Sequence, residues 1–142
     1  MGQALSVTVV SAPGSSRRRE AAGASSVDAP LAGLAGSGLA ERFRYWCGAS
    51  GRRYLFSVFP VDGRRGLDDC PFYADSVVMA VLRQADGRRR ILHAGDTGPL
   101  PEVVFGGVTL AAAVAAGANE IHLHLLASDA TARAAIVADL MG

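Results

Sequence analysis

Residues 75–83 read DSVVMAVLR, and this stretch has the strongest strand pattern in the chain. Ala85-Asp86-Gly87 follows it, and an Asp-Gly pair is typical of tight hairpin turns. Residues 88–94 (RRRILHA) then supply a second apolar run. We therefore predict a β-hairpin, whose second strand is broken by the Gly-Asp-Thr-Gly-Pro sequence at 95–99.

On the C-terminal side of this hairpin, helix and strand signals alternate. Residues 109–116 (TLAAAVAA) predict a helix, and Gly117 is placed to stop it. Residues 119–126 (NEIHLHLL) alternate in the manner of a strand. Ser128 or Asp129 then caps a final helix, which is expected to run through Met141.

On the N-terminal side, residues 42–47 (RFRYWC) and 52–60 (RRYLFSVFP) predict another hairpin around a turn at 48–51, followed by a loop at 61–72. We interpret its aromatic residues as core packing rather than as a base-stacking platform; they are Tyr45, Trp46, Tyr54, Phe56 and Phe59. The order of hairpin, hairpin, helix, strand and helix predicts an α+β fold, a small sheet of β-hairpins with packed helices.

Residues 1–40 differ in composition from the rest. They are rich in Ala, Gly, Ser and Pro, carry an Arg cluster at 17–19, and contain no aromatic residue. Such a segment buries too little apolar surface to offset its chain entropy. We therefore expect a disordered arm at 1–40 and one domain at 41–142.

The charge and residue usage exclude several function classes. The net charge is +1 and all 14 basic residues are Arg, so a strong overall attraction to nucleic acid and any lysine chemistry are excluded. Cys47 and Cys70 match no metal-knuckle spacing and are expected to be reduced thiols. We expect a cytoplasmic protein with no membrane partner, and the Arg, Ala and Gly bias indicates a GC-rich, bacterial coding sequence.

Residues 75–140 resemble the GIY-YIG nuclease superfamily. Ser76-Val77-Val78 stands at the position of the first family motif, and His93-Ala94-Gly95 at that of the second. Asp96-Thr97-Gly98-Pro99-Leu100 is similar to the turn after the second motif, and residues 137–141 (VADLM) align with the helix that carries the family's glutamate. The resemblance covers about half the chain and implies a sheet built on a hairpin, then a helix, a third strand and a last helix.

The resemblance also implies that the nuclease chemistry is lost. The family cuts a phosphodiester with one divalent metal held by its glutamate, an arginine that meets the phosphoryl charge, and two tyrosines that position or deprotonate water. These four groups correspond here to Val137, Val103, Val78 and His93. Valine neither ligates a metal nor donates to a phosphate.

Three nearby residues retain chemical capability. His93 could act as an acid or base, although a half-exposed strand-end histidine is the plainer interpretation. Glu102, in a predicted loop, and Asp139, two residues after Val137, are the alternatives for a displaced catalytic carboxylate. Two residues along a helix amount to a rotation of about 200°.

His122 and His124 form an H-x-H pattern on one face of a predicted strand. Ile121, Leu123 and Leu125 alternate with them and are expected to take the core face, which leaves the histidines on the outer or helix-edge face. A metal site would need a third ligand, such as Cys70 or His93. We expect no metal or other cofactor unless the chain is a magnesium-dependent nuclease.

Arg83, Arg88, Arg89 and Arg90 make the central hairpin basic. Together with Gly95 they are the candidate binding residues, since such arginines contact phosphates. The alternative is a solvated strand edge, where charge prevents edge-to-edge pairing.

These observations lead to three hypotheses about function. The first is a catalytically inactive GIY-YIG-like module that binds a protein or a nucleic acid. The second is a metal-dependent endonuclease with displaced catalytic residues, and the third is an interaction domain unrelated to nucleic acid. The first two differ in whether a carboxylate and an arginine converge near Gly95 and His93.

Overall fold

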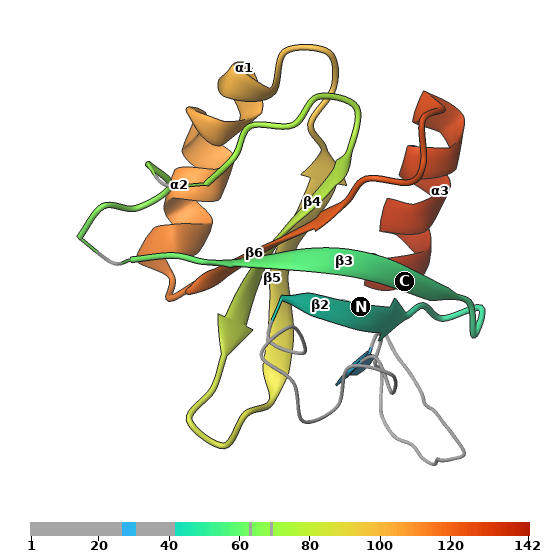
Figure 1. The fold of residues 1–142 in the computed structure, drawn as a ribbon, viewed down its shortest axis with the longest axis horizontal. Helices are drawn as coiled ribbons and strands as arrows, with labels where there is room; N and C mark the ends of the chain where they lie inside the picture. The colour runs from blue at the N-terminus through green and yellow to red at the C-terminus, as the bar shows by residue number, and fades with distance from the viewer. Residues whose placement is uncertain (1–26, 31–41, 63, 69) are drawn as a thin grey trace. The chain divides into compact units, whose positions relative to one another are not determined.

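A computed structural model describes residues 27–30, 42–62, 64–68 and 70–142 (Figure 1). The chain divides into two compact units, Met1–Ser57 with Ala135–Gly142, and Val58–Ala134. Strand β3 (Arg53–Pro60) and helix α3 (Ala130–Met141) each cross a boundary between the units. The expectation for residues 1–26 and 31–40 lies outside the described residues.

The first unit contains three antiparallel strand segments. β1 (Val27–Pro30) pairs with β2 (Phe43–Cys47), and β2 pairs with the start of β3. The predicted β2–β3 hairpin is confirmed, and Trp46 and Phe56 are buried in it. β1 lies within the segment that was predicted to be disordered, so the structure differs from that prediction for these four residues. A strand pairs through its backbone N–H and C=O groups, which the composition of the side chains does not reveal.

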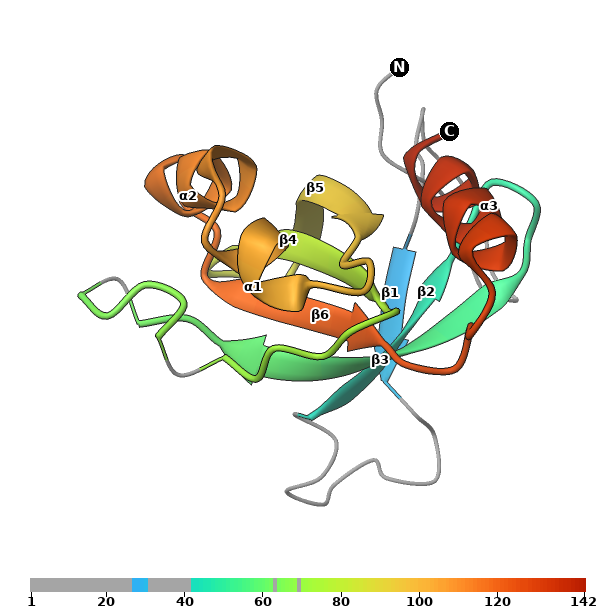
Figure 2. The same ribbon diagram turned by 90° about the horizontal axis from the view of Figure 1, so that it is seen from above.

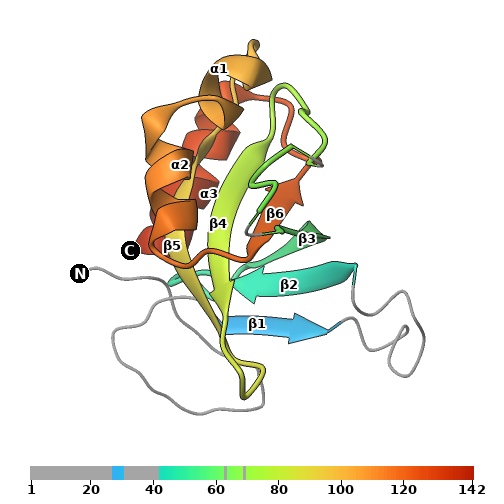
Figure 3. The ribbon, with the colours of Figure 1, turned by 90° about the vertical axis from the view of Figure 1, so that its left-hand side faces the viewer.

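The second unit is built on a sheet with β4 (Val77–Arg83) in the middle. β5 (Arg89–Asp96) and β6 (Glu120–His124) pair with β4 on either side, both antiparallel (Figure 3). Residues 77–81 of β4 are buried without alternation, as expected for a strand covered on both faces. The register shifts between Ala80 and Val81, so β5 carries a bulge there.

Helices α1 (Pro101–Phe105) and α2 (Val108–Ala115) lie over one face of this sheet (Figure 2). The core between them is made of apolar side chains from both layers; its members include Val78, Ala80, Ile121, Leu123, Phe105, Leu110 and Ala113. Val78 pairs with Leu123 and Ala80 with Ile121, which places all four on the helix-covered face. The prediction that Ile121 and Leu123 face the core is confirmed.

The predicted C-terminal end of α2 and the predicted N-terminal cap of α3 are both confirmed. Gly117 has a φ of 115°, and its N–H donates to Val114 while that of Ala118 donates to Ala113, which is a Schellman ending of α2. Asp129, rather than Ser128, caps α3, because its Oδ1 accepts from the N–H groups of Thr131 at 2.7 Å and Ala132 at 3.3 Å.

Two local features differ from the sequence prediction. α1 was not expected, since it has five residues between Leu100 and Gly106; a proline at its first position favours such a start. β5 runs through Gly95 to Asp96, so the break begins two residues later than predicted, at Thr97.

The described part of the chain is α+β, as predicted. It contains no helix long and apolar enough to cross a membrane. Cys47 and Cys70 are not joined in a disulfide, in agreement with the expectation from their spacing.

Candidate functional site

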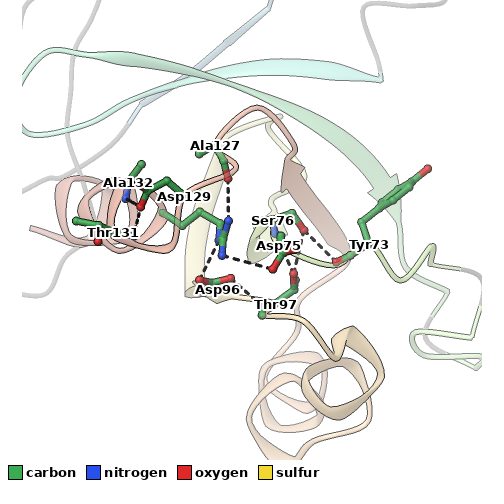
Figure 4. A network of polar contacts seen from close by, with 11 residues as sticks. Tyr73, Asp75, Ser76, Asp96, Thr97, Ala127, Asp129, Thr131 and Ala132 are labelled. Carbon is green, nitrogen blue, oxygen red and sulfur yellow. Dashed lines mark hydrogen bonds and ion pairs between the residues drawn. The ribbon is translucent and has the colours of Figure 1, made fainter.

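The end of β5 and the start of α3 meet in a polar network beside Gly95. Arg133 is buried, and its Nε donates to Asp96 Oδ2 at 2.9 Å while Nη2 lies 3.5 Å from Asp75 Oδ1 (Figure 4). Its Nη1 donates to the carbonyl of Ala127 at 3.0 Å. A carboxylate and an arginine therefore converge at Asp96, the residue after Gly95, but Asp96 pairs with Val77 and so lies on the face opposite to His93, and the arginine's charge is matched by two aspartates.

The backbone around this network is held by short local contacts. The hydroxyls of Ser76 and Thr97 lie 3.1 Å apart, and the Ser76 Oγ is also 3.1 Å from the Tyr73 carbonyl (Figure 4). The Asp75 N–H donates to the Gly98 carbonyl at 2.8 Å, with φ values of 53° for Asp75 and 65° for Gly98. Aspartate tolerates this left-handed conformation better than most residues, which explains its place in the turn.

His93 and Gly95 lie on the helix-covered face of β5, since they pair with Ala80 and Val78. A Cβ on Gly95 would stand 3.3 Å from His93 Nε2, so the missing side chain gives the imidazole its room. Burial lowers the pKa of His93 below its ordinary value. The ring is half-buried, in agreement with the plainer of the two interpretations.

The catalytic positions implied by the family resemblance occupy unlike environments. Val78 is fully buried in the core of the second unit, whereas Val103 is 65% exposed on α1. Glu102 is exposed in the first turn of α1 rather than in a loop.

Asp139 has a structural role in the first unit. Its Oδ2 accepts from Ser50 Oγ and from Tyr54 Oη, both at 2.7 Å, and its Oδ1 accepts from the Ser50 N–H at 2.8 Å. Burial alone would raise the pKa of Asp139, but the hydrogen bonds from Ser50 and Tyr54 lower it below its ordinary value. Burial and the adjacent carboxylate raise the pKa of Tyr54 to about 12.

A buried ionic cluster occupies the other end of the β4–β5 hairpin. Glu120 Oε1 lies 2.7 Å from Arg89 Nε and 2.9 Å from His122 Nε2, and Arg83 approaches Oε2 to 3.9 Å. Burial alone would raise the pKa of Glu120, but the hydrogen bonds from His122 and Arg89 lower it to about 2. The side chains of Arg89 and Glu120 are both buried, and their pairing compensates for the loss of contact with water.

The predictions for the two histidines are partly wrong. His122 and His124 do lie on the face opposite α1 and α2, because they pair with Met79 and Val77. That face is not solvent-exposed, since both histidines are buried. The description of Leu125 as a core residue is also wrong, because it follows the end of β6 and is 44% exposed.

The basic hairpin is divided between two environments. Arg89 is buried beside Glu120, so it is neither a solvated charge nor an available phosphate contact. Arg83, Arg88 and Arg90 are exposed, and Arg88 lies 3.3 Å from Asp86 within the turn. The remaining candidate cationic surface therefore consists of three arginines.

Sequence reasoning missed Asp75, Asp96, Glu120 and Arg133. For Arg133 a signal existed: with Ile136 and Leu140 it follows the i, i+3, i+7 spacing of the buried helix face. A charged residue in such a stripe needs partners, but the spacing does not reveal which carboxylates supply them. Within the described residues, no three His, Cys, Asp or Glu side chains are grouped to hold a metal ion.

Comparisons with known proteins provide no relative. No family model, no curated protein and no solved structure matches the chain.

Proposed function

We propose that this chain carries a GIY-YIG-like domain that has lost the nuclease chemistry and acts as a binding module. The observation that carries the proposal is the state of Arg133 beside the Gly95-Asp96 turn. Its three donor nitrogens contact Asp96, Asp75 and the Ala127 carbonyl, so its charge is already matched by protein groups.

The order of elements in the second unit supports the fold part of the proposal. A tight hairpin, β4–β5, is followed by helices, by strand β6 and by the start of α3. This is the order that the resemblance implies, with α1 as an addition. The tight turn is a three-residue loop in which Gly87 has a φ of 90°.

Electrostatics supports the loss of catalysis. Cleavage of a phosphodiester concentrates negative charge that a metal and a cation must meet. Val103 and Val137 stand where the resemblance places these groups, and removing one preorganised electrostatic group typically costs about a hundred- to a thousandfold in rate. A paired arginine at the Asp96 turn does not replace them.

The second candidate function is a magnesium-dependent nuclease with displaced residues. The convergence of Asp75, Asp96 and Arg133 next to Gly95 favours it, together with the exposed carboxylate of Glu102. In this alternative a substrate phosphate would have to replace an aspartate on Arg133.

The test is a cleavage assay of the full chain on single- and double-stranded DNA and RNA with magnesium or manganese. The proposal predicts no metal-dependent cleavage. Cleavage that disappears in Glu102→Gln or Asp96→Asn, but persists in the turn variant Asp86→Asn, would support the nuclease instead.

A restoration variant sharpens this test. Val103→Arg combined with Val137→Glu should create measurable magnesium-dependent cleavage if the resemblance gives the right register. Val78→Tyr is a poor addition, because Val78 is fully buried and enlarging a packed core residue costs about 1–3 kcal/mol. Such a variant would test stability rather than catalysis.

A further inference from the structure

The antiparallel sheet of the first unit has two faces with different surroundings. Trp46 and Phe56 lie on one face and are buried, in agreement with the interpretation of these residues as core packing. Tyr54, the register partner of Trp46, shares that face and donates its hydroxyl to Asp139 of α3 at 2.7 Å. The end of α3 therefore lies over the Trp46 face, and no other helix belongs to the described part of this unit.

The opposite face of this sheet carries two aromatic rings and an arginine. Three register pairs of β2 and β3 place their side chains there: Phe43 with Ser57, Tyr45 with Leu55, and Cys47 with Arg53. Directly paired residues, and residues two apart on one strand, point to the same face of a sheet. These six side chains therefore form one continuous surface, which we name the Tyr45 face. Arg53 is exposed and the other five residues are partly exposed.

Arg53 and Tyr45 are stacked across the two strands. The Cζ atom of Arg53 lies 4.3 Å from the centroid of the Tyr45 ring, a contact that diagonal neighbours can make. Among the described residues, no carboxylate forms an ion pair with Arg53. A guanidinium that lies over a ring keeps N–H groups available for a further partner. In this respect Arg53 differs from Arg89 and Arg133, whose charges are matched by carboxylates.

The acidic residues that the structure describes in the first unit are Asp28 and Asp139. Asp139 accepts hydrogen bonds from Ser50 and Tyr54, at the end of α3 over the Trp46 face. Asp28 is the register partner of Trp46 and not of Tyr45. The register pairs of β2 and β3 thus place a positive charge on the Tyr45 face and no negative one, which favours a ligand that carries negative charge.

The spacing of the two rings fits a chain of nucleotides. Phe43 and Tyr45 are two residues apart on β2, so their side chains leave the sheet about 6.6 Å apart. Sheet-based readers of single-stranded RNA stack two or three bases on aromatic side chains of this kind. Each base has a flat face for a ring and each nucleotide has a phosphate for a guanidinium, so one ligand satisfies both kinds of side chain. An acidic peptide supplies the charge without the flat faces.

We propose that the Tyr45 face binds a single-stranded nucleic acid, with bases stacked on Phe43 and Tyr45 and a phosphate held by Arg53. This rests on the proposed function, because it names the ligand class of a domain that binds rather than cleaves. The Tyr45 face lies outside residues 75–140, so it does not use the positions of the family resemblance. Since the net charge of the chain is only +1, stacking rather than overall attraction has to provide the affinity.

The experiment measures the binding of defined probes to the full chain in the presence of EDTA. Fluorescein-labelled oligo(dT) of about 12 nucleotides, a length that one binding domain can cover, is titrated with protein and followed by anisotropy. One control is an abasic oligonucleotide of the same length, which keeps the phosphates without the bases, and the other is a Glu-rich peptide. We expect saturable binding of oligo(dT) that is at least about tenfold tighter than that of either control.

A matched pair of variants tests the stacking. Tyr45→Phe keeps the ring and should leave the dissociation constant within about twofold, whereas Tyr45→Leu keeps apolar bulk without a ring and should raise it by about fivefold or more. Circular dichroism and thermal unfolding establish whether both variants are folded.

A second pair tests the charge at exposed positions, where substitution does not disturb a core. Arg53→Gln should weaken binding and reduce the slope of log Kd against log salt by about 0.7, the value for one phosphate contact on a single strand. Arg90→Gln, on an exposed residue of the β4–β5 hairpin, should leave this slope unchanged.

Four results would overturn the proposal. They are no saturable binding of oligo(dT), equal binding of either control, an equal loss in Tyr45→Phe and Tyr45→Leu, and an effect of Arg90→Gln as large as that of Arg53→Gln. None of them involves a metal, because EDTA is present throughout. Metal-dependent cleavage in the separate assay would instead contradict the proposed function, so the two failures are distinguishable.

Discussion

In both hairpins, β2–β3 and β4–β5, a three-residue loop ends in a glycine with positive φ, Gly51 at 89° and Gly87 at 90°. In both, the middle loop residue also accepts from the N–H two residues later, at 3.2 Å from Ser50 Oγ to Arg52 and at 2.9 Å from Asp86 Oδ1 to Arg88. The local turn chemistry is therefore shared.

The two turns differ in their hydrogen bonds to distant residues. The β2–β3 turn is tied to α3 through Asp139, which accepts from Ser50 and Tyr54 and leaves no room for a Cβ on Gly48. Among the described contacts, the loop residues 85–87 of the β4–β5 turn make no such long-range bond. This hairpin is held just before the turn instead, where Asn119 bonds the N–H and the carbonyl of Arg83 at 2.7 and 3.0 Å, and where Arg89 pairs with Glu120. The same local turn type therefore occurs in a hairpin whose loop residues are bonded to α3 and in one whose strands carry the long-range contacts. Asp139, the carboxylate nearest Val137 in sequence, makes the bonds to the first of these loops.

The largest expected effect is on the buried ionic cluster of the β4–β5 hairpin. Glu120→Gln removes the negative charge that compensates Arg89, and breaking a buried ion pair from one side typically costs about 3–5 kcal/mol. Urea unfolding should show this loss, while Glu102→Gln on the surface should stay within about 0.5 kcal/mol. Equal effects of the two changes would show that the cluster contributes nothing.

The same cluster gives stability a defined acid dependence. The folded pKa of Glu120, about 2, lies below its ordinary value of 4.5. Its contribution is therefore complete above about pH 4.5 and is lost as the pH falls through about 2. In Glu120→Gln, stability should lose this part of its acid dependence.

The next effect compares the two turns directly. Asp139→Ala leaves three donors from Ser50 and Tyr54 without their acceptor and should cost about 2–3 kcal/mol, whereas Asp86→Ala removes a local bond and should cost about 0.5–1 kcal/mol. Thermal or urea unfolding of the two variants measures the difference. If Asp86→Ala were as costly as Asp139→Ala, the distinction between a turn with long-range bonds to its loop and one with local bonds only would be wrong.

The smallest effect is that of one phenolic hydroxyl. Tyr54→Phe should cost about 1 kcal/mol at neutral pH, because it removes one of the hydrogen bonds to Asp139. The pKa of Tyr54 is raised from 10.0 to about 12, so this contribution is present below pH 10 and is lost as the pH rises through about 12. Alkaline unfolding of the wild type and of Tyr54→Phe should therefore converge near pH 12.

The hairpins, the stop at Gly117 and the cap at Asp129 could be predicted because they depend on neighbours within a few residues. The distant partners of Arg133, Glu120 and Asp139 could not, since each of the three bonds a side chain at least 31 positions away. Burial of His122 and His124 was missed for a related reason. The alternation of residues in β6 predicts correctly which face of the sheet carries the two histidines, but not whether that face is exposed to solvent.

The most direct test of the account asks whether any of the candidate carboxylates binds a divalent metal. Side-chain carboxyl carbons of Asp96, Glu102 and Asp139 are observed by NMR during titration with manganese, whose paramagnetism broadens signals near a bound ion. The account predicts that Asp139 keeps a pKa below its ordinary value and that manganese broadens none of the three selectively. Selective, saturable broadening of Asp96 or Asp139, reversed by magnesium, would contradict it and indicate a working metal site.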